Sequence, residues 1–227
     1  MRAKLLSDTI QSRITIEKPL SILNIGSATG RTSEILQEFG EVTSVEYDKA
    51  CCEFSKNILD MQVINASIID LPFPDEKFDL VCAFDVIEHV ADDESAISEM
   101  YRVCKASGHL FLTVPAFQSL WSVHDEVNHH YRRYRKNNLL RLFSGREGSI
   151  IKCTYFNSLL FIPIFLLRKT QAIRLSKKRK RKKSDFEVIS SSFVNRLFYS
   201  IFNLERMLLK RWAFLFGVSL MLLWKKK

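Results

Sequence analysis

The chain has 227 residues, 47% of them hydrophobic, with only seven glycines and five prolines, so it can bury one sizeable core and is not a largely disordered protein. Its formal net charge is +9, but seven of those nine charges lie in the run 177–183, which leaves two for the rest of the chain. A body so close to neutral lacks a broad phosphate-binding face, and we expect no nucleic acid as a partner.

The cysteines and the apolar stretches indicate the compartment. The five cysteines are odd in number and show no C-x-x-C spacing, which favours buried free thiols in a reducing environment. The N-terminal segment "MRAKLLSDTIQSR" has no apolar core for a secretory signal. The longest uncharged stretches, 153–167 and 212–224, are shorter than the ~20 residues that a membrane-spanning helix needs. We therefore expect a cytoplasmic protein.

From residue 20 onward, short apolar runs alternate with helical patterns. Strands are predicted over 20–26, 41–47, 61–67, 78–85 and 108–116. Helices are predicted over 29–39, over 48–59 and between the last two of these strands, where Gly108 is expected to end the helix. This alternation predicts a doubly wound α/β sheet of mostly parallel strands. Ligands of such sheets bind at the carboxyl ends of the strands, where the strand order reverses.

The first strand-to-helix turn, "LNIGSATG" (23–30), resembles the Gly-rich turn of class I S-adenosylmethionine-dependent methyltransferases, whose pattern is acid-x-Gly-x-Gly-x-Gly. Asn24 stands in place of the acid and Ala28 in place of the middle glycine, so we expect altered or weakened cofactor binding. The candidate cofactor-binding residues of the turn are Asn24, Gly26, Ser27, Ala28 and Gly30. A plain tight turn or a nicotinamide site would have similar residues, so the turn alone leaves those alternatives open.

Two further stretches extend the resemblance. Glu46 ends the second strand, where a carboxylate can accept both hydroxyls of an adenosine ribose. The segment "DLPFPDEKFDLVCAFDVIEHV" (70–90) resembles the region of the third and fourth strands in the methyltransferase type 11 family. This resemblance implies that Ser67 and Ile68 lie near the adenine, and that Phe84 and Asp85 face the methionine part of S-adenosyl-L-methionine.

The likeness continues through 113–143 and through 216–226. The stretch 113–143 is similar to a bacterial branch of that family with His-Asp, His and Arg-Arg-Tyr after the fifth strand. It implies a Rossmann-like class I methyltransferase fold: a seven-stranded, mostly parallel sheet with an antiparallel last strand and a helical insertion before that strand. The expected organisation is a cofactor-binding core over 1–155, the insertion over 156–212 and the last strand over 213–227. Relatives often begin with an aromatic-rich segment, so part of the usual cofactor lid is expected to be missing.

Polar side chains gather in "SVHDEVNHHYRRYRK" (122–136), which leaves the fifth strand at the carboxyl edge of the sheet. A hydroxyl acceptor needs a base for its proton, and histidine is suited to that role near neutral pH. The candidate catalytic residues are His89, His124 and Asp125, and the candidate substrate-binding residues are His129, Arg132, Arg133 and Tyr134. A capping role for Asp125, and a solvated connector over 129–134, are the alternatives.

Three other functions remain open. Asp85-x-x-Glu88-His89 is similar to an array in ubiquinone O-methyltransferases in which a divalent metal has been implicated, but no H-E-x-x-H pattern occurs and we assign no metal ligand. A nicotinamide-dependent oxidoreductase explains residues 20–46 but not 70–90. A non-catalytic relative that binds S-adenosylmethionine is suggested by Asn24 and Ala28.

The insertion combines apolar and basic segments. Residues 156–169 are almost wholly apolar, and 193–211 predict an amphipathic helix whose apolar stripe is Val194, Leu197, Phe198, Ile201, Leu204 and Leu208. The run 177–183 joins them and is a solvated loop, an RNA contact or localisation signal, or a site of attraction to anionic lipid. We predict methyl transfer to an oxygen of a small or lipid-linked acceptor, with peripheral contact to an anionic membrane. A helical cover over the active site is the alternative role of the insertion.

Overall fold

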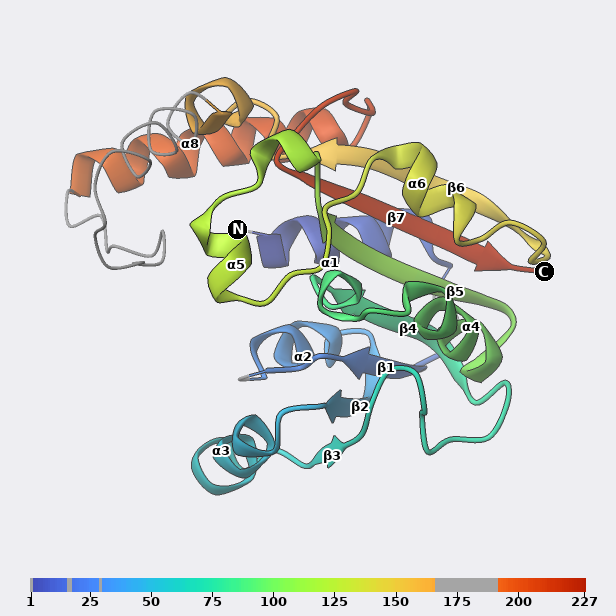
Figure 1. The fold of residues 1–227 in the computed structure, drawn as a ribbon. Coiled ribbons are helices and arrows are strands. Elements are labelled where there is room, and N and C mark those ends of the chain that lie inside the picture. The colour runs from blue at the N-terminus through green and yellow to red at the C-terminus, as the bar shows by residue number, and fades with distance from the viewer. Residues whose placement is uncertain (1, 16–17, 29, 166–191) are drawn as a thin grey trace.

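The computed structural model describes residues 2–15, 18–28, 30–165 and 192–227 (Figure 1). Seven strands form one sheet in the order β3-β2-β1-β4-β5-β7-β6. The pairs from β3 to β5 are parallel, and β7 runs antiparallel to both β5 and β6, which confirms the predicted fold class. The strands are β1 (Leu20–Ile25), β2 (Gly40–Glu46), β3 (Val63–Asn65), β4 (Phe78–Phe84), β5 (Cys104–Pro115), β6 (Gly148–Phe156) and β7 (Ser219–Lys226).

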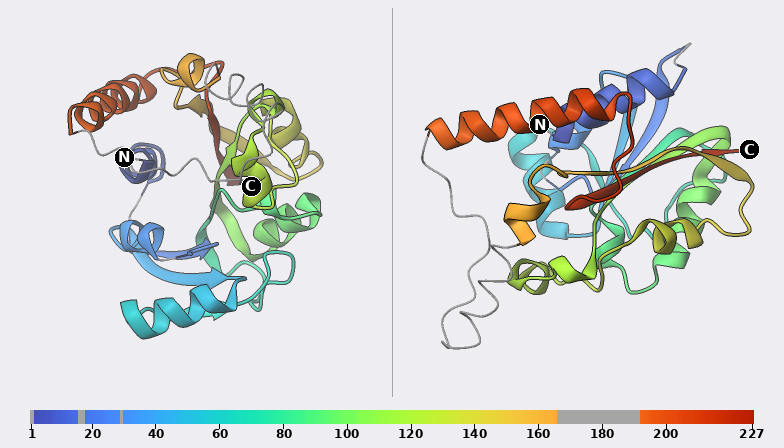
Figure 2. Two further views of the ribbon diagram at one scale, coloured as in Figure 1. Left: turned by 60° about the vertical axis from the view of Figure 1, so that its left-hand side comes forward. Right: turned by 90° about the horizontal axis from the view of Figure 1, so that it is seen from above.

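Helices cover both faces of this sheet (Figure 2). They are α1 (Arg2–Arg13), α2 (Arg31–Leu36), α3 (Lys49–Leu59), α4 (Asp93–Val103), α5 (Val123–Val127), α6 (Lys136–Arg141) and α8 (Ser192–Leu209), with the short 3-10 turns η1 (Ile87–His89) and η2 (Gln118–Leu120). One core layer lies between the sheet and α4 and α6, and the other between the sheet and α1, α2 and α8. Successive residues of β4 alternate between the two layers, as the period of two in a strand requires.

The structure corrects one predicted boundary. α4 ends at Val103 and β5 begins at Cys104, so Gly108 lies inside the strand and does not end the helix. A Cβ atom at Gly108 would lie 2.8 Å from Cys104 Sγ and 3.0 Å from the Asp79 carbonyl oxygen. Close packing within the sheet therefore explains the glycine at this position. Glycine occurs both at helix ends and in strands where other atoms approach the backbone closely, so its presence alone did not identify a helix end.

The N-terminal helix α1 is an element that the sequence patterns did not predict. Its apolar residues Leu5, Leu6 and Ile10 are buried on one face against the sheet. The buried Thr9 hydroxyl donates to the Leu5 carbonyl oxygen at 2.8 Å, so this polar group is satisfied within the helix. α1 thus completes the core layer that it shares with α2 and α8.

The cysteines and the predicted insertion can be compared with the structure in part. All five cysteines are free thiols, as predicted, and three of them are buried. The basic run 177–183 lies outside the described residues, while 161–165 are helical and α8 spans most of the predicted helix 193–211. Among the described residues, we find no helix with the length and apolar character needed to cross a membrane.

We expect Gly40→Ala to destabilise the fold strongly. A Cβ atom at this position would lie 2.0 Å from the Leu20 carbonyl oxygen, and the two residues are partners in the β1–β2 register. The strands would have to separate at this point, which should cost about 2–3 kcal/mol and lower the melting temperature by about 5–10 °C. Calorimetric melting measures this loss, and the exposed neighbour in Glu41→Ala is the control. Equal melting temperatures for the two variants would contradict the close contact.

Candidate active site

The Gly-rich turn lies at the carboxyl end of β1 and is held by backbone contacts. The amide of Gly26 donates to the Val45 carbonyl oxygen at 2.8 Å, and Gly26, Ala28 and Gly30 have positive φ angles of 69°, 45° and 82°. A Cβ atom at Gly26 would lie 2.4 Å from Cγ2 of Val86, which follows β4. Glycine is therefore required at 26 by both space and backbone conformation, whereas Ala28 shows that a methyl group is tolerated in the middle of the turn.

Asn24 lies beneath the turn and is completely buried. Its Nδ2 atom donates to Thr32 Oγ1 at 3.0 Å and to Ser33 Oγ at 2.8 Å, and Ser33 in turn bonds Ser44 Oγ at 2.8 Å. Asn24 therefore connects β1 to the start of α2. A change at this residue would act on the position of the turn, because the side chain does not reach the surface.

Glu46, at the end of β2, holds the turn from the other side. Its carboxylate accepts the amide of Ala28 at 2.9 Å and the amide of Asp48 at 3.0 Å, one on each oxygen. Each carboxylate oxygen has a second acceptor position, so hydroxyl groups of a ligand can still bind there. Ser27 Oγ, which is buried within the turn, has no hydrogen-bond partner among the described residues. The turn thus offers both an anionic acceptor and an unsatisfied hydroxyl.

The four other candidate cofactor residues divide between the sheet edge and the core. The Ser67 hydroxyl accepts the Ile69 amide at 3.4 Å, while Ile68 is buried in the core. Phe84 is also buried and packs edge-to-face on Phe111, with ring centroids 5.2 Å apart. Asp85 has a positive φ of 55° and accepts the Thr113 hydroxyl at 3.0 Å. Of the two residues Phe84 and Asp85, it is Asp85 that lines a cavity.

This cavity has a volume of about 320 Å³ and lies beyond the ends of β4 and β5; we call it the histidine cavity. Residues from three segments of the chain, 85–89, 115–133 and 218–219, line it, among them Asp85, Glu88, His89, His124, Asn128 and His130. The structure therefore brings His89 and His124 together, as the sequence predicted for residues that follow neighbouring strands.

Asp125 pairs with a different histidine from the one predicted. The carboxylate is completely buried and accepts His130 Nδ1 at 2.9 Å, Arg133 Nε at 2.7 Å and the Ser122 amide at 2.8 Å. His124, its neighbour in sequence, instead contacts the side-chain amide of Asn128 at 3.1 Å. Consecutive residues of a helix point about 100° apart, so the side chains of Asp125 and His124 do not face each other.

The pKa of the Asp125 carboxyl reflects these contacts. Burial by itself would raise the pKa, but the hydrogen bonds from His130 and Arg133 hold it well below its usual range. Asp125 is therefore ionised at neutral pH. An ionised carboxylate only accepts hydrogen bonds, so His130 donates to it through Nδ1, and Nε2 is the ring nitrogen left for other partners.

His89 contacts His130 on the other side. Their rings meet edge-to-face with centroids 4.5 Å apart. Loss of solvent contact and then the neighbouring His130 lower the pKa of His89, while the charges of Asp85 and Glu46 act in the opposite direction. His89 therefore lies within electrostatic reach of both the histidine cavity and the acid that holds the Gly-rich turn.

One group of side chains among the described residues could hold a metal ion. Ligand atoms of Glu88, His89 and His130 all lie within 4.8 Å of one another. Two nitrogens and a carboxylate oxygen suit several divalent metals, so the donor set alone does not select one. Of the predicted array Asp85-x-x-Glu88-His89, this group contains the last two members.

The predicted substrate-binding residues after α5 mostly bind the protein itself. Arg132 donates to the Ala91 carbonyl oxygen at 2.6 Å and pairs with Asp93 at 2.7 Å, and the buried Tyr134 hydroxyl donates to Asp93 at 2.7 Å. Arg133 is buried against the carboxylate of Asp125. His129 is exposed, has a positive φ of 56° and does not line the histidine cavity. Their role in substrate binding remains a prediction.

Six residues that line the histidine cavity were assigned no role from the sequence: Glu88, Pro115, Asn128, His130, Val218 and Ser219. In the sequence, His130 follows Asp125 by five residues, and the end of a helix lies between them. This spacing is the feature that could have indicated that the two side chains pair. Asn128 marks that end, because it is the C-cap that follows the last residue of α5. Recognising the pair requires knowing where α5 stops, and no glycine or proline marks the position in the sequence.

Comparison with known proteins agrees with the arrangement at the sheet edge. A family model described as a methyltransferase domain matches residues 23–112, from β1 to β5. The chain is 27% identical over 124 residues to a ubiquinone/menaquinone biosynthesis C-methyltransferase of Psychromonas ingrahamii, covering 48% of this chain and 49% of that protein. It is 26% identical over 129 residues to a demethylmenaquinone methyltransferase of Staphylococcus epidermidis, covering 51% and 54%.

The chain thus spans about half the length of the curated relatives that it matches. Among solved structures, an S-adenosylmethionine-dependent methyltransferase from Archaeoglobus fulgidus superposes with a TM-score of 0.59 at 17% identity. The match covers 99% of this chain and 94% of that one. At 17% identity, this superposition shows that the two proteins share a fold.

Proposed function

We propose that the chain is a class I S-adenosylmethionine-dependent methyltransferase of the type 11 family, and that it transfers a methyl group from S-adenosylmethionine to a small or lipid-linked acceptor. One observation carries the proposal. The Glu46 carboxylate and the Gly-rich turn lie at the ends of β1 and β2, and the histidine cavity lies at the ends of the adjacent strands β4 and β5. A cofactor and an acceptor therefore have neighbouring sites along one edge of the sheet.

The residues of the Gly-rich turn and Glu46 would hold the cofactor. Glu46 would accept the ribose hydroxyls, and the unsatisfied Ser27 hydroxyl and the amides at the start of α2 would face its polar groups. S-adenosylmethionine supplies a methyl group that is already activated by its sulfonium. The remaining work of the chain is to orient the acceptor and to remove its proton, and positioning of this kind can contribute ~7–11 kcal/mol.

His130 is the residue that we assign as the base. Its Nδ1–H is held by Asp125, so Nε2 is the atom that can take a proton from an acceptor in the histidine cavity. Asp125 is a positioning residue, because it is completely buried and acts through His130. The candidate bases from the sequence were His89 and His124, the latter with Asp125 beside it in the chain. His130 replaces His124 in the proposal because it is His130 that bonds the carboxylate.

We retain oxygen as the accepting atom, with carbon as the alternative. Removal of a proton from a ring hydroxyl increases electron density on the oxygen and on the adjacent ring carbons, so the same base serves either outcome. The two curated relatives are named as methyltransferases of quinone biosynthesis, one of them a C-methyltransferase, which favours an aromatic acceptor. Two-dimensional NMR of a 13C-methylated product distinguishes a methoxy carbon from a ring methyl carbon.

Titration calorimetry tests the cofactor site directly. We expect S-adenosylmethionine and S-adenosylhomocysteine to bind and NAD to give no heat. Glu46→Gln should weaken binding of S-adenosylhomocysteine by about 10–100-fold, because hydrogen bonds to a charged group contribute about 1.5–3 kcal/mol. Glu53→Gln, at an exposed position of α3, is the matched control.

The outcomes separate the three candidate functions. Binding of NAD in preference to S-adenosylmethionine would indicate an oxidoreductase and would contradict the proposal. If the protein binds S-adenosylmethionine but methylates none of the hydroxylated aromatic and lipid-linked acceptors, a non-catalytic relative would be favoured. Equal affinities of the Glu46→Gln and Glu53→Gln variants would remove Glu46 from the site.

A further inference from the structure

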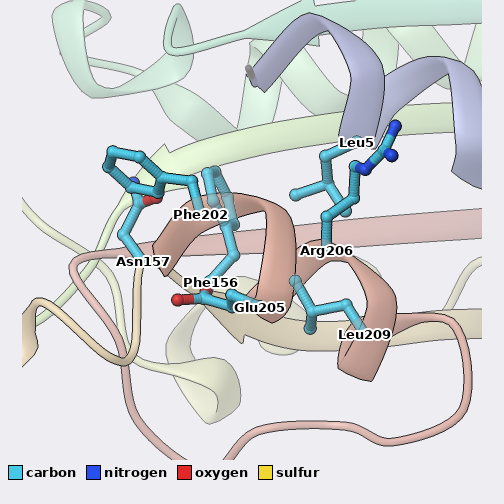
Figure 3. A pocket seen from close by; sticks show the side chains of 7 residues that line it. All are labelled: Leu5, Phe156, Asn157, Phe202, Glu205, Arg206 and Leu209. Atoms are coloured by element: carbon cyan, nitrogen blue, oxygen red, sulfur yellow. The ribbon is translucent and has the colours of Figure 1, made fainter. Parts of the chain in front are cut away.

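α8 packs on the protein through one face. Phe202, Glu205, Arg206 and Leu209 point from this helix towards Leu5 and Phe156 around a small cavity of about 160 Å³ (Figure 3). Glu205 is buried, and its carboxylate accepts the amides of Ser158 and Leu159 at 3.0 and 3.1 Å. This inner face fixes the helix against α1 and the end of β6.

The apolar stripe predicted from the sequence is only partly covered: Phe198, Ile201 and Leu208 are partly buried, and its other edge is exposed. Leu204 and Leu197 belong to that stripe and are 53% and 48% exposed, and Met207 beside them is 59% exposed. At 100° per residue, Leu204 is 100° away from Glu205, so this edge of the stripe turns away from α1, whereas Phe198 lies within about 20° of Glu205. We call Leu197, Leu204 and Met207 the outer face of α8. A stripe of this kind usually packs into a core, and here its members Leu197 and Leu204 are exposed.

Neighbouring segments extend the outer face. In the connection from α8 to β7, Trp212 and Leu215 are 66% and 87% exposed. Ile162, in the short helical segment 161–165, is also exposed. The rings of Phe161 and Phe216 lie 5.6 Å apart and join these two segments. Together the three segments expose six large apolar side chains, Leu197, Leu204, Met207, Trp212, Leu215 and Ile162.

The segments that form this area carry mainly positive charge, although Asp8 of α1 pairs with Arg206 and Lys210 beside it. Residues 156–168 and 192–227 contain a single acidic residue, Glu205, and that residue is buried. Arg196, Lys210 and Arg211 are exposed on α8 or directly after it. An apolar surface bordered by cations, with a tryptophan at its edge, is complementary to an anionic bilayer, where lipid headgroups meet the cations and the acyl region meets the apolar side chains.

We propose that the outer face of α8, with Trp212, Leu215 and Ile162, is a docking surface for an anionic lipid bilayer. α8 would lie in the plane of the interface, since it is amphipathic. The docking does not require methyl transfer. One consequence does rest on the proposed function: Val218 and Ser219 line the histidine cavity and follow Phe216 in the chain, so docking would bring the cavity close to the lipid. An acceptor with an apolar tail could then enter without leaving the bilayer.

Vesicle flotation of the full chain tests the docking. The vesicles are phosphatidylcholine alone, or phosphatidylcholine with about 30 mol% phosphatidylglycerol. We expect the protein to float with the anionic vesicles and to stay largely unbound with the neutral ones. The double variant Leu204→Gln with Leu215→Gln should reduce its partition into anionic vesicles about tenfold or more, because it removes two apolar side chains from the interface.

A matched double variant controls for lost apolar surface in general. Ile58→Gln with Ile150→Gln changes two exposed isoleucines on α3 and β6, outside the proposed surface, and should float as the wild type does. Melting temperatures of both variants should equal that of the wild type, since all four side chains are exposed. This measurement shows that the variants are folded without reference to cofactor binding.

Each remaining outcome overturns the proposal. No flotation of the wild type, equal flotation with both kinds of vesicle, or equal flotation of the two double variants would each do so. A wild-type dimer in light scattering that Leu204→Gln with Leu215→Gln converts to a monomer would assign the surface to a second copy of the chain. Calorimetry with S-adenosylhomocysteine reads the proposed function independently, so a failure of docking and a failure of cofactor binding are distinguishable.

Discussion

His130→Ala is expected to lower the rate of methyl transfer by about 10²–10⁴-fold while the affinity for S-adenosylhomocysteine changes little. The loss follows from the position of His130, whose Nδ1 is bound by Asp125 and whose other nitrogen is directed to the cavity that it shares with His89 and His124. Single-turnover rates with a hydroxylated acceptor, together with calorimetry, measure the two quantities separately. A loss of affinity equal to the loss of rate would contradict the assignment.

The neighbouring histidines discriminate between the prediction from sequence and the arrangement in the structure. If His124 is the base, the large loss of activity should occur in His124→Ala, and His130→Ala should keep most of its activity. Asp125 should then not influence the reaction through His130. If Glu88, His89 and His130 hold a metal ion, EDTA should abolish wild-type activity, and Mg²⁺ or Mn²⁺ should restore it. Either result would remove the assignment of His130 as the base, and the second would make it a ligand.

Asp125→Ala should destabilise the protein by about 3–5 kcal/mol, which is the largest effect on folding that we expect. The substitution leaves the guanidinium of Arg133, whose side chain is 3% exposed, as an unpaired buried charge. Urea unfolding measures the change. Asp125→Ala combined with Arg133→Met should recover much of the loss, because it removes both charges. Asp75→Ala breaks a pair with Arg102 in which the acid is exposed, and should cost less than about 1 kcal/mol.

The pH dependence of stability provides an independent check on this ion pair. The pKa of Asp125 is lowered by folding, so its contribution is present above the unfolded pKa of about 3.9 and is lost as the pH falls through the folded value. The wild type should therefore lose stability below about pH 4 more steeply than Asp125→Ala. Parallel curves for the two proteins in acid would show that the carboxylate is not stabilised by its contacts.

The sequence determined the sheet and the side of it that carries the site. Buried parallel strands are apolar along their length, so the runs over 20–26, 41–47 and 78–85 could be read directly and were confirmed. The carboxyl ends of these strands must meet at one edge, which is why residues near Gly26, Glu46 and Asp85 could be grouped from their places in the chain alone. α1 carried no comparable signal, because a single short amphipathic helix has weak local preferences.

Only the tertiary structure decided which groups pair at the edge. Asp125, His124 and His130 lie close together in the chain, and the choice between the two histidines depends on where α5 ends and on the direction in which each side chain leaves it. The outer face of α8 is a similar case. The spacing of Leu197 and Leu204 shows that an apolar stripe exists, but the neighbours of the helix determine whether that stripe is buried. A periodic pattern specifies the faces of an element, and contacts between distant segments select the face that packs.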